Sequence, residues 1–537
     1  MKKVQKAQLR LGIFIPMATI FLAAIILGLV APKAFFDAEN AIVQYAFDSW
    51  GWLFQLSGNI LLAICAWVGL SKYGKIRLGG EDAKPTLSKW NWFAISLTAG
   101  IATGILFWGI AEPITHFMAP PEVLGLAPGS EDAAMFAMSQ SYIHWTFIPY
   151  AMYSVAGIGI AFATYNMKKR YSVSSVLYPI FGEKVYGSVG TVVDNLCLFA
   201  MAGGVAAVLG VATTQISAGL NYLFGIEPTK TVWIAIVGVI VASYVISSYT
   251  GLNKGIKFLA DKNSKLFIAM LIFIFIFGPT KFILSLGTQS TGYFLDNFWS
   301  RTLMTSPIDG SPWPRWWPIY YWAIWLAYAP LTGMFLAKIS KGRTVREFMT
   351  VNLVLPAVFG MFWFMVYGGA AIDLELKGAG MWAAIQSSGL EVSVFEFLKN
   401  YPLATVMSVL FIIAIYVSVV TLADSMTSTV SSLSTSAHNN AEVEPPGQVK
   451  LFWGAIMSSM AIINLLAGSA GEISGIDATK QIATVAGFPI LFLMLLMGYS
   501  TIRMFTDREK YDVAYYPELA KGTDVETSVE VKSEEAV

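Results

Sequence analysis

Apolar residues occur along this chain in long blocks, and short polar segments separate one block from the next. Most blocks are about 20 residues long, which is the length that an α-helix needs to cross a hydrocarbon layer about 30 Å thick. Because the blocks follow one another over almost the whole chain, the pattern predicts an all-α membrane protein with twelve transmembrane helices. The predicted spans are residues 11–32, 50–71, 91–110, 138–164, 190–217, 230–250, 265–287, 316–338, 350–373, 402–430, 450–468 and 480–503.

Several segments lie outside this pattern. Residues 292–312 and 379–400 mix apolar and charged residues over runs that are too short to cross, so we predict amphipathic helices along the membrane surface. The segment 506–537 is polar and acidic, which is typical of a disordered tail. The predicted organisation is a tail over residues 1–10, one twelve-helix domain over residues 11–505 and an acidic tail over residues 506–537.

Lys and Arg are distributed unevenly among the polar segments. They are frequent in the N-terminal tail and in four loops, and they are scarce in the segments 33–49 and 111–135. Loops that are rich in Lys and Arg stay on the cytoplasmic side of a membrane. We therefore predict a multi-pass protein of the cell membrane with both termini in the cytoplasm. The four basic loops are residues 72–89, 165–186, 251–265 and 338–347.

The composition argues against several other classes of protein. Hydrophobic residues make up 56% of the chain and charged residues 13%, whereas soluble proteins carry roughly 25% charged residues. Cys65 and Cys197 both lie in apolar blocks, and the chain has only three histidines, so we expect neither a disulfide nor a metal site. A phosphate-binding loop and a Ser/His/Asp constellation are missing from the sequence, so we expect no enzyme, no cofactor and no nucleic-acid partner.

Glycine and proline interrupt the third and the eighth predicted spans. The third contains Gly100 and Gly104, and the eighth contains Pro318 and Pro330. Interruptions in corresponding spans point to a transporter with inverted repeats, although Gly and Pro are frequent in membrane helices in any case. Small residues at the first interruption also let backbone N–H groups face a ligand carboxylate. The candidate residues there are Gly100, Ala102 and Gly104.

Aromatic residues are concentrated in two of the spans. In the eighth span, Tyr321, Trp325 and Tyr328 are spaced i, i+4 and i+7, so they share one face of the helix. Trp145 and Tyr153 lie within the fourth span. Each aromatic face attracts a quaternary ammonium group, which is weakly hydrated, by about 0.5–2 kcal/mol. The alternative is that these residues anchor the helices at the membrane interface, where Trp and Tyr are common.

Four groups of motifs carry a resemblance to a known family. They are YYWAIW (320–325) followed by GMFLAKISKGRTVREF (333–348), FWGIAEP (107–113), HWTFIPYAMY (144–153) and TLADS (421–425). On these residues the chain resembles the betaine/choline/carnitine transporter family over residues 10–505. The resemblance implies a LeuT-like transporter fold with two inverted five-helix repeats, residues 91–287 and 316–503. It also implies a homotrimer that forms partly through the helix at 292–312.

The resemblance further implies a central substrate site made of aromatic residues, which we call the aromatic box. Its members in this sequence are Trp145, Tyr150, Tyr153 and Trp325, with Tyr321 and Tyr328 on the same helix face as Trp325. Tyr150 stands where the betaine carriers of the family usually have Trp, and Ile324 and Tyr328 stand where members with a full tryptophan box have Trp. Choline-type members carry an acidic residue at the position of Gly104, so the glycine favours a zwitterion over a plain cation.

The coupling ion is not determined by the sequence. In sodium-coupled relatives one site uses backbone carbonyls of the third span and two hydroxyls of the tenth, which correspond here to Thr98, Ile101, Thr421 and Leu422. The second hydroxyl is therefore missing, and the segment Gly203–Gly210, where a second sodium site would need hydroxyls, has none. Sodium symport, proton coupling and exchange all stay open.

These observations predict a secondary active transporter that takes up glycine betaine, carnitine or a related methylated amine as an osmoprotectant or nutrient. A sodium-independent antiporter that exchanges a quaternary amine for its product is the alternative. Two ionisable residues near the box are candidates for function, because such residues are rare inside a membrane. We expect Glu112 at the outer end of the third span, and His144 either as a hydrogen-bonded helix histidine or as a proton carrier.

Overall fold

The structure is a computed structural model that describes residues 8–100, 104–250, 253–436, 445–470 and 475–516. In these ranges the ordered elements are α-helices, short 3-10 helices and π-turns. Nine helical stretches in the described part of the chain are long and apolar enough to cross a membrane, and a tenth is obtained if one bent pair of helices counts as a single span. The prediction of an all-α membrane protein is therefore confirmed.

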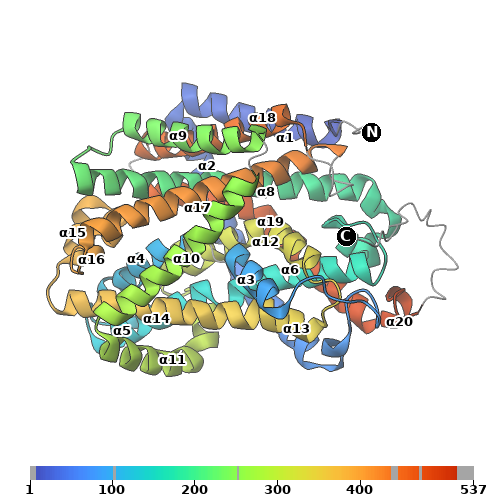
Figure 1. Cartoon of the computed structure of the whole chain (residues 1–537), viewed down its shortest axis with the longest axis horizontal. Coiled ribbons are helices and arrows are strands. Elements are labelled where there is room, and N and C mark those ends of the chain that lie inside the picture. Colours follow the sequence, from blue (N-terminus) through green and yellow to red (C-terminus); the bar gives the residue numbers. More distant parts are fainter. Residues whose placement is uncertain (1–7, 101–103, 251–252, 437–444, 471–474, 517–537) are drawn as a thin grey trace.

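The long helices are stacked in layers, as Figure 1 shows. Helices α1 (Leu11–Val30), α9 (Lys230–Thr250) and α18 (Gly447–Ala470) form one edge of the view, and α8 (Ser188–Phe224) and α17 (Ala404–Leu433) lie next to them. The opposite edge is formed by α5 (Glu131–Trp145), α11 (Thr280–Thr302) and α14 (Leu355–Leu376). Between these layers lie α6 (Phe147–Tyr165), α12 (Tyr320–Lys338) and α19 (Gly475–Thr506), which form the centre of the bundle.

The three central helices approach one another very closely because small residues lie at their contacts. A Cβ atom added to Gly487 of α19 would lie 1.9 Å from the carbonyl oxygen of Ala323 on α12, which no side chain could tolerate. Small residues let helix backbones come into direct contact, and this replaces the hydrophobic driving force that is weak between helices in lipid. The packing therefore fixes the position of α12, which carries half of the predicted box.

At the second helix, the predicted end of the span 11–32 and the predicted start of the span 50–71 are both wrong. Residues 33–49 are not a loop, because α2 extends over 39 residues from Pro32 to Leu70. Pro32 occupies the first turn of this helix, where its missing N–H costs no hydrogen bond. Glu39 is compatible with burial in α2 since the side chain of Asn464 donates a hydrogen bond of 2.8 Å to it.

The predicted span 265–287 and the predicted surface helix 292–312 are both wrong in their limits. Helix α10 (Asn253–Phe277) ends before Gly278-Pro279, and α11 runs from Thr280 to Thr302 at an angle of 105° to it. Proline lacks the N–H that would continue the helix, and its ring disfavours a helical residue before it, so the chain turns here. Helix α11 then packs against α5 and α14.

Several spans are broken in the middle. The third predicted span consists of α3 (Lys89–Gly100) and α4 (Ile105–Met118), and residues 101–103 between them lie outside the described residues. The fourth consists of α5 and α6, which separate at Thr146 with φ −123° and ψ −109°. Pro149 removes a helical hydrogen bond just after this point, which explains the break. A π-turn, Arg315–Ile319, precedes α12, and a second one, Thr350–Val354, separates α13 (Val345–Met349) from α14.

Short elements complete the described chain. The predicted surface segment 379–400 forms the two short helices α15 (Met381–Ser388) and α16 (Ser393–Leu398). The beginning of the predicted disordered tail is ordered, because α20 (Arg508–Tyr511) is followed by Asp512, which accepts a hydrogen bond of 3.0 Å from the side chain of Asn166. The remaining short helices are Lys72–Lys75, Glu122–Leu124, Ser174–Leu177, α7 (Tyr178–Phe181), Gly182–Tyr186 and Leu390–Val392.

Candidate binding site

A cavity of about 460 Å³ lies in the centre of the bundle. One of its walls is formed by α5, α6 and α12 and carries aromatic residues, among them Trp145, Tyr153 and Trp325. The wall opposite is formed by α8 and α17 and carries mainly small and aliphatic residues, such as Ala207 and Leu422. We call these two surfaces the aromatic wall and the aliphatic wall. The volume is in the range that small-molecule sites occupy.

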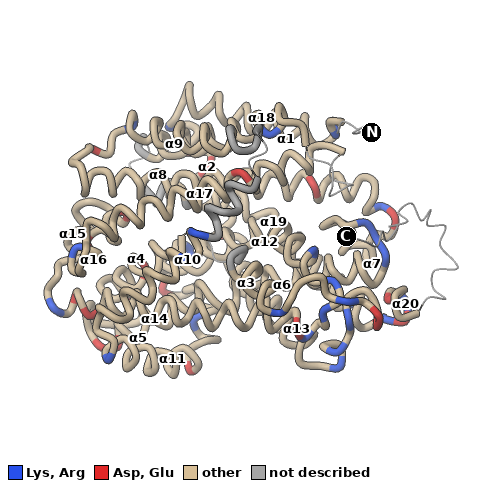
Figure 2. The backbone as a smooth tube through the Cα atoms, in the orientation of Figure 1, with Lys and Arg blue, Asp and Glu red and all other residues tan. Residues whose placement is uncertain are grey.

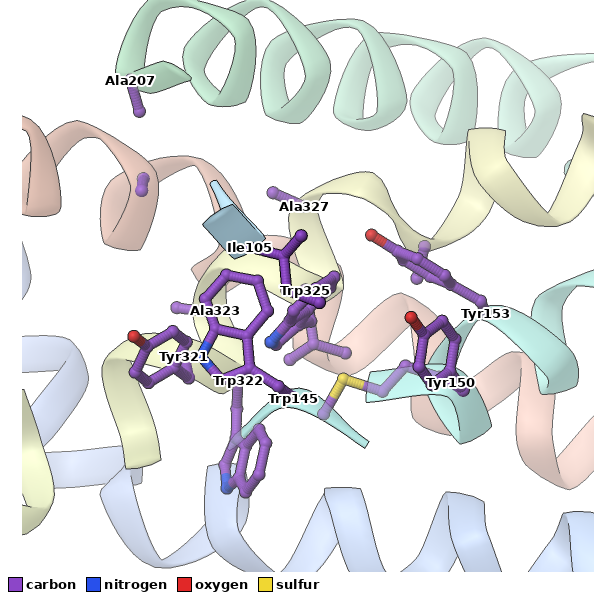
Figure 3. Packing of buried hydrophobic residues seen from close by; sticks show 14 of the residues in the cluster. Ile105, Trp145, Tyr150, Tyr153, Ala207, Tyr321, Trp322, Ala323, Trp325 and Ala327 are labelled. Carbon is purple, nitrogen blue, oxygen red and sulfur yellow. The ribbon is translucent and has the colours of Figure 1, made fainter. Parts of the chain in front are cut away.

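The aromatic wall brings the two predicted clusters of aromatic residues together. The ring centroids of Trp145 and Trp325 lie 5.3 Å apart at an interplanar angle of 89°, and those of Tyr153 and Trp325 lie 5.7 Å apart at 72°. Figure 3 shows these rings grouped beside α12, with Ala207 of α8 across the space from them. Rings at near right angles present both faces and edges to one ligand, and edge-to-face pairs are themselves favourable.

Tyr321 and Tyr328 extend the aromatic wall in two directions along α12. The ring centroid of Tyr321 lies 5.5 Å from that of Trp145 and 6.0 Å from that of Trp108. Tyr328 reaches the opposite wall, because a Cβ atom on Gly204 would lie 3.0 Å from its ring. The absence of a side chain at Gly204 thus makes room for this ring against α8.

A buried carboxylate lies behind the aromatic wall. Glu112 of α4 has no solvent-accessible surface, and its Oε2 atom accepts hydrogen bonds from Nε1 of Trp145 at 2.8 Å and from the hydroxyl of Tyr321 at 2.5 Å. Its Oε1 atom lies 2.5 Å from Nδ1 of His144. The carbonyl oxygen of His144 in turn accepts a hydrogen bond of 3.0 Å from Nε1 of Trp325. One carboxylate and one histidine therefore orient three rings of the site.

Comparison with known proteins identifies the family of the chain. Residues 12–510 match the family described as BCCT, betaine/carnitine/choline family transporter. The glycine betaine transporter OpuD of Bacillus subtilis is 34% identical over 478 residues, which cover 88% of this chain and 90% of that protein. The ectoine/hydroxyectoine transporter of Virgibacillus pantothenticus is 31% identical over 507 residues, which cover 94% and 99%. The probable glycine betaine transporter of Desulfitobacterium hafniense is 32% identical over 486 residues, which cover 90% and 95%.

This chain belongs to the BCCT family. The family resemblance predicted from the sequence motifs is therefore confirmed over nearly the whole chain. The predicted class, a transporter rather than an enzyme, is confirmed as well, because the family and its relatives are transporters.

Not all residues that the family resemblance assigns to the site line the cavity. Gly104 lines the cavity beside the aromatic wall, as do Tyr321 and Tyr328. Tyr150 is buried on α6 near Tyr153 but is not among the residues that line the cavity. Trp322, which follows Tyr321 in the chain, points away from the cavity and donates a hydrogen bond of 2.6 Å to Gln55 of α2.

The residues assigned to the ion site are only partly described. Thr421 and Leu422 both line the cavity, and the hydroxyl of Thr421 donates a hydrogen bond of 2.7 Å to the carbonyl of Val417. Gly100 is the last residue of α3, and its side-chain surroundings and those of Thr98 are not described. Ile101 and Ala102 lie outside the described residues.

Of the two functional candidates near the box, Glu112 differs from what the sequence suggests, whereas His144 has the hydrogen bonds of one of its two predicted roles. Glu112 does not end the third span at the outer face, because it lies fully buried in the middle of α4 and α4 continues to Met118. His144 makes hydrogen bonds with both ring nitrogens, since Nε2 lies 2.8 Å from Nε2 of Gln140. The FWGIAEP motif contains Glu112, but its 32-residue separation from His144 hides the contact in the sequence.

The same region brings together three residues of metal-binding type. The side chains of Glu112, His116 and His144 are buried, and their ligand atoms lie within 4.8 Å of one another. The sequence argument against a metal site relied on the small number of histidines, and it did not foresee that two of the three lie together. Oε2 of Glu112 already accepts hydrogen bonds from Trp145 and Tyr321, and this favours a hydrogen-bonded carboxylate over a metal ligand.

The sequence analysis also missed one polar region of the cavity. Asn263 of α10 and Ser418 of α17 both line the cavity, and Nδ2 of Asn263 donates a hydrogen bond of 2.6 Å to the Ser418 hydroxyl. Gln215 of α8 and Ser264 of α10 line the cavity as well. A polar residue within an apolar span is a signal that could have revealed Gln215, because such residues are hydrogen-bonded or functional. Asn263 and Ser264 were hidden because they fall in the predicted basic loop 251–265, which the structure shows to be part of α10.

Proposed function

We propose that this protein is a secondary active transporter that takes up glycine betaine or a closely related trimethylammonium zwitterion. The observation that carries the proposal is the arrangement of Trp145, Tyr153 and Trp325 around one buried cavity. A trimethylammonium group spreads its charge over three methyl groups, so it loses little hydration on entering such a site, and aromatic faces attract it. The names of the relatives from Bacillus subtilis and Desulfitobacterium hafniense support the same substrate class.

The other end of a betaine is an anion, and α4 offers a place for it. Gly104 lines the cavity and immediately precedes α4, so the first backbone N–H groups of this helix are close to the ligand space. Unpaired N–H groups at a helix start favour a carboxylate. Gly104 itself brings no negative charge into the cavity, which suits a zwitterion better than a plain cation such as choline.

For the whole chain we propose twelve spans with two inverted five-helix repeats and a LeuT-like arrangement. In favour of this architecture are irregular points in corresponding spans, at Gly104 before α4 in the third and at the π-turn Arg315–Ile319 in the eighth. Nine or ten apolar stretches and the shorter apolar helix Lys230–Val245 supply most of the required spans. If the protein is a homotrimer, α11 takes the place of the surface helix predicted at 292–312.

We further propose that both termini lie in the cytoplasm. Figure 2 shows Lys and Arg gathered most densely around α7, α13 and α20, at the end of the molecule where the described chain starts before α1 and ends after α20. Positively charged loops stay on the cytoplasmic side of a membrane, which supports this orientation.

Sodium is our candidate for the coupling ion in a symport mechanism. Thr421 supplies a hydroxyl at the cavity, and backbone carbonyls of Thr98 and Ile101 would complete the set of ligands. The second candidate is sodium-independent exchange of quaternary amines, which is favoured by Leu422 beside Thr421 and by the lack of hydroxyls in Gly203–Gly210 of α8.

The test is uptake of radiolabelled glycine betaine by purified protein in proteoliposomes. Unlabelled carnitine, choline, ectoine and a neutral sugar serve as competitors, and sodium, proton and substrate gradients are applied one at a time. We expect competition by betaine-like compounds and none by the sugar, with uptake that depends on a sodium gradient. Uptake of the sugar without binding of any onium compound would refute the proposed substrate class. Uptake that requires only internal amine would establish exchange in place of symport.

A further inference from the structure

We propose that Glu112 is the counter-charge for the substrate cation and that it acts from behind the aromatic wall, through Trp145 and Tyr321. In this role Glu112 is a positioning and specificity-determining residue, although it does not line the cavity. The inference rests on the proposed function, because it requires that the cavity binds an onium group.

Full burial favours the neutral form of Glu112, and the hydrogen bonds around it favour the ionised form. Trp145 Nε1 can only donate, and it points at Oε2 over 2.8 Å. The hydroxyl of Tyr321 reaches the same oxygen, and Nδ1 of His144 reaches Oε1, each at 2.5 Å. With the amide nitrogen of Gln140 placed 2.8 Å from its Nε2 atom, His144 accepts there and donates from Nδ1. A carboxylate that receives three donors is best satisfied when it carries a negative charge.

Within the described residues, no Lys or Arg forms an ion pair with this carboxylate. Among the described residues, the ion-pairing partners of Glu112 are His144 and His116, the latter with its Nε2 atom 3.5 Å from Oε1. Neither is a permanent cation, whereas Lys or Arg would be. A buried carboxylate without a paired cation is costly, even when it is hydrogen-bonded. An onium group bound in the box would supply the missing positive charge, so ligand binding and charge pairing would reinforce each other.

The electrostatic effect of the Glu112 carboxylate reaches the cavity through the rings. An N–H or O–H group that donates to a carboxylate leaves more electron density on its ring, and this strengthens attraction of a cation to the ring face. The Coulomb attraction itself also acts across the ring, because a separation of about 8 Å at an effective dielectric constant of about 20 still changes affinity by about tenfold or more. A ligand of the same shape without the positive charge would gain neither effect.

Two ligands of the same shape, only one of which carries a positive charge, distinguish recognition of charge from recognition of shape. Glycine betaine and 3,3-dimethylbutanoate have the same branched outline and the same carboxylate, but only the first has a positive nitrogen. Dissociation constants for both are measured by calorimetry on the purified full chain, and the ratio of the two constants reports how strongly the site prefers the cation. In Glu112→Gln this preference should fall by at least about tenfold, because the charge that favours the cation is gone.

Three further variants control for structural effects. Glu112→Asp keeps the charge, so its preference for the cation should stay within about threefold of wild type, even if both ligands bind more weakly. Glu39→Gln removes another buried carboxylate, bonded to Asn464 on a different part of the fold, and should leave the preference unchanged. Glu112→Met is a second neutral substitution for the case that Glu112→Gln does not fold, which thermal unfolding would reveal.

The outcomes distinguish this inference from the function it rests on. If the neutral variants bind both ligands more weakly by the same factor, the preference for the cation is unchanged. Glu112 then only holds the rings in place, and the counter-charge proposal is wrong. If the wild-type protein itself binds no onium ligand, the proposed substrate class fails first, whatever the variants do. A tenfold loss of preference in a neutral variant, with preference kept in Glu112→Asp, supports the counter-charge.

Discussion

The two walls of the cavity differ in almost every property that matters for recognition. The aromatic wall holds Trp145, Tyr153 and Trp325, and the hydrogen bonds that the two indoles donate to the Glu112 carboxylate and the His144 carbonyl fix the orientation of their rings. The aliphatic wall consists of α8 and α17, whose lining residues are mostly small or branched aliphatic side chains with a few hydroxyls. Under the proposed function, recognition of a charged ligand would depend mainly on the aromatic wall, and the aliphatic wall would mainly exclude water.

This difference explains how a cation can be bound selectively without a carboxylate in the cavity. Aromatic faces attract the cation, and the aliphatic wall removes competing water, which strengthens every electrostatic interaction across the space. On this wall α17 does offer hydroxyls at the cavity, but Leu422 occupies the second of the two positions where the family places the sodium hydroxyls, so a sodium site is difficult to derive from the sequence. The contrast can be tested by substitutions on the two walls, each with a matched control.

The largest effect is expected for Trp325→Ala. The substitution removes the ring that packs against both Trp145 and Tyr153, so the dissociation constant for glycine betaine should rise at least about tenfold. The matched substitution on the aliphatic wall, Val208→Ala, should change it less than about twofold, because it removes only two methyl groups that do not attract charge. If calorimetry shows that the two substitutions raise the dissociation constant equally, the two walls do not differ in recognition.

The sequence indicates the residues of the aromatic wall far better than it indicates the hydrogen bonds behind that wall. Tyr321, Trp325 and Tyr328 share a helix face by spacing alone, local motifs bring in Trp145 and Tyr153, and all five line the same cavity. By contrast, Tyr150 follows the same motif but lies outside the cavity lining, because the break at Thr146 and the start of α6 decide which way each ring points.

Contacts between distant segments are what the sequence does not reveal. Hydrophobic periodicity depends on neighbours within a few turns, whereas the contact of Glu112 with His144 joins residues 32 positions apart. Helix limits fail for a related reason. The turn at Gly278-Pro279 interrupts a run of apolar residues that looks continuous, and Pro32 starts a helix inside a segment whose acidic residues suggest a loop.

The second-largest effect is expected for Gly104→Asp. The new carboxylate would enter the cavity beside the aromatic wall and pair with a plain cation, so the preference for choline over glycine betaine should rise about fivefold to tenfold. The Cβ atom would lie 3.0 Å from the ring of Trp108, which must move by a few tenths of an ångström. Gly104→Asn has nearly the same shape and no charge, so competition assays on it should show no gain for choline.

A smaller effect is expected where the two walls touch. Gly204→Ala places a methyl group 3.0 Å from the ring of Tyr328, and the ring must shift toward the cavity, so the apparent affinity for glycine betaine should fall about threefold. Gly238→Ala on α9 is the control, because a Cβ atom there meets no other described atom within 4 Å. Uptake kinetics that are identical for the two variants would mean that Tyr328 plays no part in binding.

The smallest effect is expected for Thr421→Ala on the aliphatic wall. In a sodium symporter the loss of this hydroxyl should raise the sodium concentration for half-maximal uptake by about twofold, because carbonyl ligands would still hold the ion. Thr288 of α11 does not line the cavity and hydrogen-bonds Leu284 as Thr421 bonds Val417, so Thr288→Ala should leave the sodium dependence unchanged. If uptake by the wild-type protein is the same when potassium replaces sodium, the aliphatic wall holds no coupling ion, and the difference between the walls is then one of recognition alone.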